Sequence, residues 1–332
     1  MQNSYKILIF IFILLLQSCA GPQSQTNKPL EQGVLFPVER NNQWGFIDHR
    51  GNIVIPLKYE GAVDFSEGRA LVKTEGRWGY INEWDIWVVS PEYEEAYKFS
   101  EGLAQVKYDG RYGYINKVGL MVVDPKFEEA NPFSEGLASV KLNGRWGYIN
   151  KEGVMVIQPR YEKAFNFSEG LALVMADGKG GFIKKNGDTF IEPKFKWAQG
   201  YSEGLAGVMV DDQYVYIDKF GEAKFKTNFQ GIRPFSEAAA AFTRNGKQGF
   251  INKNGIIIVQ PQYEQVGDFS QGLASVKLDG QWGFIDKRER IIIEPQFLTA
   301  VSFLEGLAIV EIDNGKWAYI DKKGHFVWKS FE

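Results

Sequence analysis

A unit of 34 residues recurs nine times along this chain, and this repetition constrains the fold more than any other feature. The positions that open the Trp-Gly phrase lie 34 residues apart, except for a last interval of 35: Trp44, Trp78, Tyr112, Trp146, Gly180, Tyr214, Gln248, Trp282 and Trp317. A second phrase, Phe-Ser-Glu-Gly, keeps the same spacing from Phe65 to Phe303. A fixed period of this length predicts a tandem repeat protein in which each unit packs on its neighbours.

Turn signals inside each unit predict strands, although a period of 34 also suits helical tetratricopeptide repeats. Asn-Gly or Asp-Gly pairs such as Asn143-Gly144 precede most of the Trp-Gly phrases. These pairs favour a hairpin because both central residues of a type I′ turn need positive φ. Runs rich in β-formers flank the turn, and a third run ends on proline at Pro159. Each unit is therefore predicted to be a three-stranded antiparallel meander, followed by a connector that can hold a short fourth strand.

Alternation along the strand explains why the phrase recurs. Trp146 and Tyr148 share one face of the predicted strand, while Gly147 and Ile149 share the other. Large side chains on both faces indicate that both are covered, and a glycine inside a strand indicates a close approach of another group. Stacked units can share a continuous core that a single meander of this size could not supply.

The predicted fold is therefore all-β, a tandem array of nine antiparallel β-meander repeats over residues 34–332. Propellers usually have four to eight blades and commonly divide one blade between the two ends of the chain. Here the first unit begins at its first strand and the last ends at its third, so no unit is divided. We expect an open, solenoid-like array in preference to a propeller-like ring.

The beginning of the chain differs in composition from the repeats. Lys6 precedes an unbroken apolar run over residues 7–16, which is too short to span a bilayer but suits a signal peptide. The run ends in LQSC, which resembles the lipobox of bacterial lipoproteins. The resemblance implies a signal peptide over residues 1–18 and lipid attachment at Cys19, with residues 19–33 as a flexible tether.

Cys19 is the only cysteine, so an internal disulfide is impossible. A lipid on this residue explains its placement and would hold the protein on a membrane without a spanning helix. A simple cleaved secretory signal is the alternative. By the same resemblance, Ala20 favours the outer membrane if the cell is Gram-negative. The expected location is the bacterial cell envelope.

The motifs G-x-W-G-[YF]-I-[ND] and F-S-E-G-L-A, repeated in register from Val34 to Trp328, resemble those of the bacterial WG-containing repeat proteins, including KWG-type lipoproteins. The resemblance implies β-rich repeats in cell-envelope and other bacterial proteins, mostly without an assigned function. It brings no catalytic residues with it.

Catalytic motifs are missing from the sequence. The two histidines, His49 and His325, fall in the first and last repeats, so a metal site would require the ends to meet. We expect both to be exposed turn residues. No enzyme activity, cofactor or metal site is predicted. A net charge of −3 also argues against a nucleic-acid partner.

Carboxylates recur at the third place of the Phe-Ser-Glu-Gly phrase: Glu67, Glu101, Glu135, Glu169, Glu203, Glu237 and Glu305. A row of them could bind cations or basic partners. Alternatively, they could accept hydrogen bonds from backbone N–H groups at tight turns. Gln271 occupies the remaining copy and keeps an acceptor without the charge, which favours the second interpretation. Glu60, Glu94, Glu128, Glu162 and Glu264 form a second, more interrupted series that is interpreted in the same way.

Departures from the pattern give candidate binding residues. Trp84 and Trp197 replace polar residues of the other units, and could stack on a sugar or anchor a protein partner. Trp87 and Trp328 align with apolar positions and are expected to pack. The units over residues 177–252 are the most degenerate, through drift or because they form a partner-binding surface.

Together these features predict a lipid-anchored scaffold of the cell envelope that acts through protein–protein contacts of its repeats. The alternative is a carbohydrate- or peptidoglycan-binding module that uses exposed aromatics, with Trp84 and Trp197 as ligand contacts. The predicted partners are a membrane, reached through the N-terminal lipid, and an unidentified protein or an envelope polysaccharide.

Overall fold

The computed structural model describes residues 33–331, and in that range every regular element is a β-strand. Neighbouring strands pair in antiparallel fashion in nine sheets of three or four strands, called blades 1–9 in chain order. The predicted signal peptide, Cys19 and most of the predicted tether lie outside the described residues. The described residues include no helix long and apolar enough to cross a membrane.

Blades 1–5 contain the first nineteen strands. Blade 1 has β1 (Phe36–Arg40), β2 (Gln43–Ile47) and β3 (Ile53–Tyr59); blade 2 has β4 (Gly61–Ser66), β5 (Arg69–Thr74), β6 (Arg77–Ile81) and β7 (Trp87–Tyr93). Blade 3 has β8 (Glu95–Ala96), β9 (Leu103–Tyr108), β10 (Arg111–Asn116) and β11 (Met121–Phe127). Blade 4 has β12 (Glu129–Ala130), β13 (Ala138–Leu142), β14 (Arg145–Ile149) and β15 (Met155–Tyr161); blade 5 has β16 (Lys163–Ala164), β17 (Leu171–Ala176), β18 (Lys179–Lys184) and β19 (Thr189–Phe195).

Blades 6–9 contain the other fifteen. Blade 6 has β20 (Ala206–Val210), β21 (Gln213–Ile217) and β22 (Ala223–Lys226); blade 7 has β23 (Gly231–Ile232), β24 (Ala239–Arg244), β25 (Lys247–Asn252) and β26 (Ile257–Tyr263). Blade 8 has β27 (Gln265–Val266), β28 (Ala274–Leu278), β29 (Gln281–Ile285) and β30 (Ile291–Phe297); blade 9 has β31 (Thr299–Ala300), β32 (Leu307–Asp313), β33 (Lys316–Asp321) and β34 (Phe326–Lys329).

Blade 4 shows how the repeat folds. Asn143 and Gly144 have φ of 52° and 75°, so the predicted left-handed hairpin turn joins β13 to β14. The predicted meander of three long strands is confirmed. The connector does hold a short fourth strand, as predicted, and this strand pairs with the meander that follows it (β12 with β13).

The glycine of the Trp-Gly phrase lies against the backbone of its own blade. A Cβ on Gly147 would stand 2.4 Å from the carbonyl oxygen of Ile157 and 2.8 Å from the nitrogen of Pro159. Between Trp146 and Tyr148 the pairing of β14 with β15 slips, which marks a β-bulge at this point. The close approach expected of this glycine is confirmed, and the approaching group is the bulged third strand.

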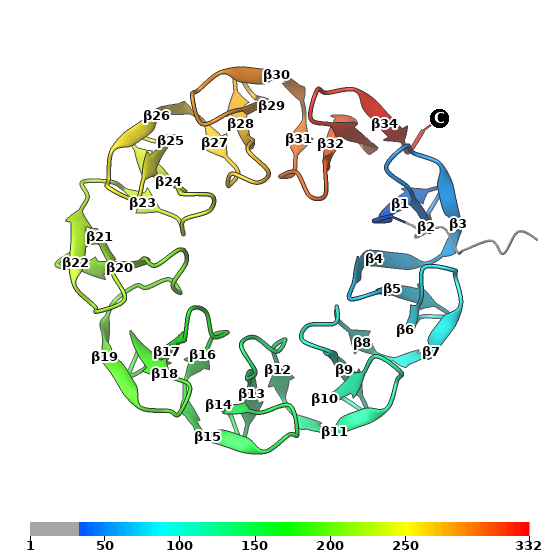
Figure 1. Cartoon of the computed structure of the whole chain (residues 1–332), viewed down its shortest axis with the longest axis horizontal. Coiled ribbons are helices and arrows are strands. Elements are labelled where there is room, and N and C mark those ends of the chain that lie inside the picture. Colours follow the sequence, from blue (N-terminus) through cyan, green and yellow to red (C-terminus); the bar gives the residue numbers. More distant parts are fainter. Residues whose placement is uncertain (1–32, 332) are drawn as a thin grey trace, which may run out of the picture. The chain divides into compact units, whose positions relative to one another are not determined.

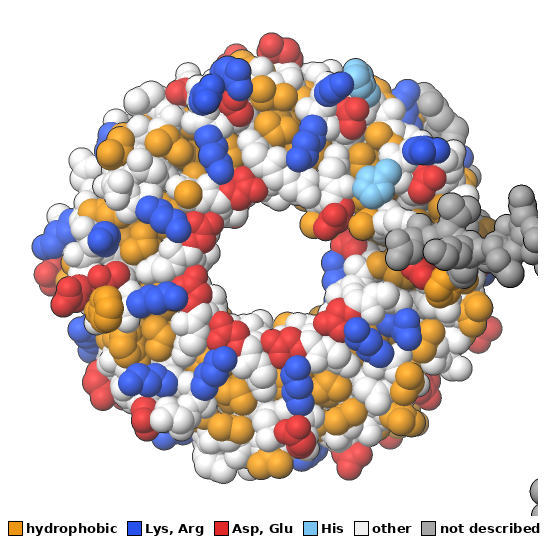
Figure 2. All heavy atoms as spheres, viewed as in Figure 1, with side chains coloured by type: hydrophobic (Ala, Val, Ile, Leu, Met, Phe, Trp, Pro, Cys, Tyr) orange, Lys and Arg blue, Asp and Glu red, His pale blue; other side chains and the backbone are white. Residues whose placement is uncertain are grey.

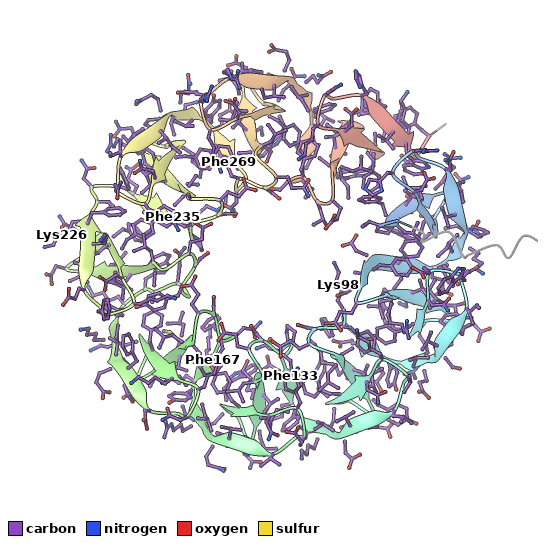
Figure 3. The ribbon with its side chains drawn as sticks, viewed as in Figure 1. Lys98, Phe133, Phe167, Lys226, Phe235 and Phe269 are labelled. Atoms are coloured by element: carbon purple, nitrogen blue, oxygen red, sulfur yellow. The ribbon has the colours of Figure 1, made fainter. Side chains whose placement is uncertain are left out.

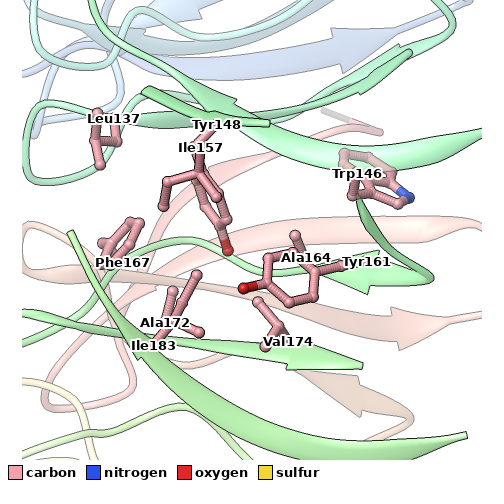
Figure 4. Close-up of a cluster of buried hydrophobic side chains, with 10 residues drawn as sticks. All are labelled: Leu137, Trp146, Tyr148, Ile157, Tyr161, Ala164, Phe167, Ala172, Val174 and Ile183. Carbon is pink, nitrogen blue, oxygen red and sulfur yellow. The ribbon is translucent and has the colours of Figure 1, made fainter. Parts of the chain in front are cut away.

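The core lies between blades. One buried cluster combines Tyr148, Ile157 and other residues of blade 4 with Phe167, Val174 and other residues of blade 5, as Figure 4 shows. The Tyr148 side chain reaches from blade 4 to blade 5, where its hydroxyl donates a hydrogen bond to the carbonyl oxygen of Phe165 at 2.7 Å. Each blade is therefore buried by its neighbours, and stability is shared around the array.

The array closes on itself, so the prediction of an open solenoid was wrong. Blades 9 and 1 share a core cluster in which Phe36 and Val38 meet Tyr319 and Trp328. The Tyr319 hydroxyl donates to the carbonyl oxygen of Pro37 at 2.8 Å, the same kind of bond that Tyr148 makes inside the array. We call this contact between blades 9 and 1 the seam. Among the described residues no sheet combines strands of both blades, so side-chain packing closes the seam and strand pairing does not.

The blades surround a central opening, with the third long strands, such as β7, β15 and β30, at the rim (Figure 1). The short strands and the Phe-Ser-Glu-Gly turns lie nearer the opening (Figure 1). The arrangement is a nine-bladed β-propeller. Blade 6 is the most reduced of the predicted degenerate units: an isolated bridge between Ala198 and Val208 replaces its short strand.

Candidate functional site

The Phe-Ser-Glu-Gly phrase connects successive blades near the central opening, around which Phe133, Phe167, Phe235 and Phe269 lie (Figure 3). Ser134 Oγ donates to the carbonyl oxygen of Phe167 in the next blade at 2.7 Å. The carboxylate of Glu135 accepts from the N–H of Gly170, also in the next blade, at 3.0 Å. The phrase is therefore an inter-blade clasp.

A lysine completes each of six clasps. In blade 5, Lys185 Nζ lies 3.0 Å from the Glu135 carboxylate of blade 4. The other pairs are Lys117–Glu67, Lys151–Glu101, Lys219–Glu169, Lys253–Glu203 and Lys287–Glu237, at 2.8–3.3 Å. Figure 2 shows acidic side chains around the opening with basic side chains beside them. Each of these six carboxylates is neutralised within the protein, so the acceptor interpretation is confirmed for them.

The clasps have consequences for protonation. Burial raises the pKa of Glu135, but hydrogen bonds from the Lys185 ammonium and the Gly170 N–H outweigh it, so the pKa lies below its ordinary value. The pKa values of Glu67, Glu101 and Glu203 are lowered by the same balance of causes. Gln271 accepts from the N–H of Gly306 at 2.8 Å, so the uncharged copy keeps the acceptor role.

The second acidic series acts inside a blade. Glu128 accepts from the N–H of Gly144, in the hairpin turn of its own blade, at 3.0 Å. Glu60, Glu94, Glu162 and Glu264 make the same contact in their blades. This series therefore stabilises the left-handed turns, as predicted.

Both histidines are exposed, and the seam gives one of them a structural partner. His49 Nε2 lies 3.0 Å from the carbonyl oxygen of Glu305, so blade 1 contacts the clasp of blade 9. His325 Nδ1 lies 3.1 Å from the Asp321 carboxylate of its own turn. Among residues 33–331, no group of three or more His, Cys, Asp or Glu side chains could hold a metal ion.

The predicted ligand residues Trp84 and Trp197 lie in different blades. Trp84 stands 51% exposed in a turn of blade 2. Trp197 is partly buried beside blade 6, and its ring meets that of Tyr214 edge-on at 5.0 Å. The structure therefore does not bring these two side chains into one site. Trp328 packs as predicted, whereas Trp87 is 38% exposed.

An exposed apolar surface runs across the rim of blades 2–4, and we call it the apolar arc. Its members are Trp84, Ile86, Trp87, Val118, Leu120, Met121, Val122, Val154 and Val156, each 37–64% exposed. The turn of each blade lies against the third strand of the blade before it, since a Cβ on Gly119 would touch Val89. Arc residues of neighbouring blades therefore lie on segments that adjoin one another.

Corresponding positions in blades 5 and 6 are mostly polar. In blade 5, Asp188 and Thr189 occupy the places of Leu120 and Met121. In blade 6, Glu222 and Lys224 occupy the places of Leu120 and Val122. The apolar arc is therefore interrupted at blades 5 and 6, although exposed apolar residues return at the same positions of blades 7 and 8, with Ile256, Ile291 and Ile292. Contiguous exposed apolar surface of this kind marks interaction sites.

Comparisons with known proteins agree with this architecture. The described part of the chain is a repeat β-propeller. The family model of the WG containing repeat matches its sequence at residues 44–78, 78–112, 112–146, 146–179, 181–214, 216–247, 249–282 and 282–317. The chain belongs to the family of WG containing repeat proteins. No curated protein matches it.

Many solved structures match this chain, among them the following two. One is the eukaryotic initiation factor, with a TM-score of 0.63 and 10% identity over 89% of this chain and 95% of that chain. Another is BamB from Moraxella catarrhalis, with a TM-score of 0.44 and 13% identity over 79% of this chain and 91% of that chain. At such identity the first similarity concerns the fold alone.

Proposed function

We propose that the protein is a scaffold of the bacterial cell envelope, lipid-anchored through Cys19, that holds a protein partner on its apolar arc. The observation that carries this proposal is the exposure of large apolar side chains across three adjacent blades. Burying such side chains against a partner is favourable in proportion to the apolar area removed from water. Trp84 is the natural anchor, because aromatic residues dominate the energetics of protein interfaces.

A pulldown from solubilised envelope with the full chain tests the arc. We expect one stoichiometric protein to be retained by the wild type and lost in Leu120→Asp, which places a charge in the middle of the arc. Phe220→Asp is the matched control, since Phe220 occupies the same turn of blade 6 and is 82% exposed. Equal retention by both variants would contradict the proposal.

The anchor is tested separately by fractionation. The wild-type protein should be found in the membrane fraction and should incorporate a labelled fatty acid. The Cys19→Ser variant should be absent from the membrane fraction and should incorporate no fatty acid. Membrane association of Cys19→Ser equal to that of the wild type would contradict lipid anchoring and leave the scaffold proposal standing.

A further inference from the structure

A groove of about 920 Å³ follows the inner edges of blades 2–4, on other residues than the apolar arc. Trp78, Tyr112 and Trp146, the aromatic residues of three successive Trp-Gly phrases, contribute to its wall. The segments that follow β8 and β12 supply polar side chains to the same groove. Lys98, one of these, lies beside the central opening in Figure 3.

Gln105 gives the groove an unused hydrogen-bond acceptor. Its side chain is part of the lining and is 3% exposed, yet its Oε1 has no hydrogen-bond partner among the described residues. The corresponding residues of the other blades, at intervals of 34, are Pro37, Leu71, Ser139, Leu173, Gly207, Ala241, Ser275 and Ile309. A buried carbonyl oxygen without a donor is destabilising. A ligand hydroxyl that donates to it would therefore be favoured.

The charges that line the groove are already balanced. Glu95 accepts from Lys107 Nζ at 2.8 Å and also from the hydroxyl of Tyr112. Glu129 is paired with Lys141 at 2.7 Å, and Lys98 with Asp64 at 2.5 Å. A cationic or anionic ligand would therefore find no opposite charge that is free of a partner.

We propose that this groove binds a neutral oligosaccharide. Aromatic rings offer flat apolar faces for sugar rings, and Tyr97, at 42%, is among the exposed aromatic residues. Gln105 and Asn131 supply amide groups that can bond hydroxyls. A groove with aromatic walls and a few placed polar groups has the composition of a small-ligand site. Its balanced charges disfavour a basic peptide.

Isothermal titration calorimetry on the full chain tests this proposal, with chitotetraose, cellotetraose and tetralysine as probes. Two variants address the groove: Gln105→Leu removes the buried acceptor with little change of volume, and Tyr97→Ala removes an exposed ring. Phe165→Ala is the matched control, because Phe165 occupies the place of Tyr97 in blade 5, where Gly180 replaces the tryptophan. Thermal unfolding of each variant confirms that it is folded.

The wild type is expected to bind at least one of the two saccharides. Each groove variant should weaken that binding about tenfold, the equivalent of one lost hydrogen bond or ring contact. Phe165→Ala should bind like the wild type, and so should the arc variant Leu120→Asp, which separates this test from that of the scaffold. Absence of saccharide binding, equal binding by all variants, or binding of tetralysine alone would overturn the proposal.

Discussion

Each glutamate of an inter-blade clasp adopts a backbone conformation that its own side chain does not favour. Glu135 has φ of 53°, in the left-handed region, which costs an ordinary residue about 1–2 kcal/mol. Its carboxylate accepts from Gly170 and pairs with Lys185, both in the next blade. These contacts offset the strain, so the side chain is there to join blades.

Replacing Glu135 separates the two contacts. In Glu135→Ala, the N–H of Gly170 and the ammonium of Lys185 both lose their partner, and we expect the unfolding free energy to fall by about 1–3 kcal/mol. Glu135→Gln keeps an acceptor and loses only the ion pair, for about 0–1 kcal/mol. Denaturant unfolding measures both. Equal losses would show that the hydrogen bond contributes nothing.

Acid should weaken the clasps. The folded-state pKa values of Glu67, Glu101, Glu135 and Glu203 lie below the ordinary value of 4.5. A lowered folded pKa contributes stability that is fully present above 4.5 and is lost as the pH falls through the folded value. We expect Tm to fall below about pH 4.5, and to fall less steeply when all four residues are glutamine. Parallel Tm–pH curves would contradict this assignment.

The repeat pattern predicted that these glutamates accept hydrogen bonds, but it did not predict which groups donate to them. Gln271 among seven glutamates indicated that an acceptor was needed more than a charge, and the hydrogen bond to Gly306 confirms it. The acceptor was expected to act at a tight turn, whereas its donor belongs to the next blade. Positions in one repeat do not reveal which repeat a side chain faces.

Within a blade, the glycine of the second long strand and the proline of the third form a pair. Gly147 faces the bulged backbone beside Pro159. Val215 and Ala318 replace the glycine in blades 6 and 9, where the third strands, β22 and β34, have four residues in place of seven. Glycine is therefore required at this position only in blades whose third strand has the bulge, because a Cβ there would collide with the bulged backbone.

Gly147→Ala should destabilise the protein strongly. The new Cβ would lie 2.4 Å from the carbonyl oxygen of Ile157, so the bulge must shift, at a cost of about 2–3 kcal/mol. Ala318→Gly, at the same place in blade 9, is the control and should cost no more than about 1 kcal/mol. Tm values of the two variants decide the matter. A harmless Gly147→Ala would contradict the pairing of glycine with bulge.

Strands and turns were predictable from sequence because their signals are local. Asn143-Gly144 predicts its turn, and alternation of apolar residues predicts the strands around it. The groove of blades 2–4 was not predicted, because Trp78, Gln105 and Trp146 belong to three different repeats. The one available signal was Gln105, an amide at a place where the other repeats have apolar or small residues.

On the scale of the molecule, the sequence did not show closure. The small rotation from one blade to the next decides between a solenoid and a ring, and no single residue encodes it. One signal was available: an open array needs terminal repeats with a polar outer face. The end repeats carry apolar residues instead, Phe36 and Val38 in the first and Trp328 in the last, and these pack together.

The seam should be sensitive to loss of Trp328, which is 8% exposed and lies under the guanidinium of Arg40. Trp328→Ala removes a large buried ring and is expected to cost about 3–5 kcal/mol. Trp84→Ala removes an exposed tryptophan and should leave Tm nearly unchanged. Small-angle scattering should show expansion only in the first variant if the ring opens at the seam. Equal Tm values for the two variants would contradict the packing described for the seam.

Closure itself is tested most directly by the distance across the seam. Spin labels at Asn42 and Ser330, in a Cys19→Ser background, report on blades 1 and 9, while labels at Asn42 and Asp177 report across the opening. In the closed ring, double electron–electron resonance should give a short, narrow distance for the seam pair and a much longer one for the other. A seam distance as long as the distance across the opening would contradict the nine-bladed propeller.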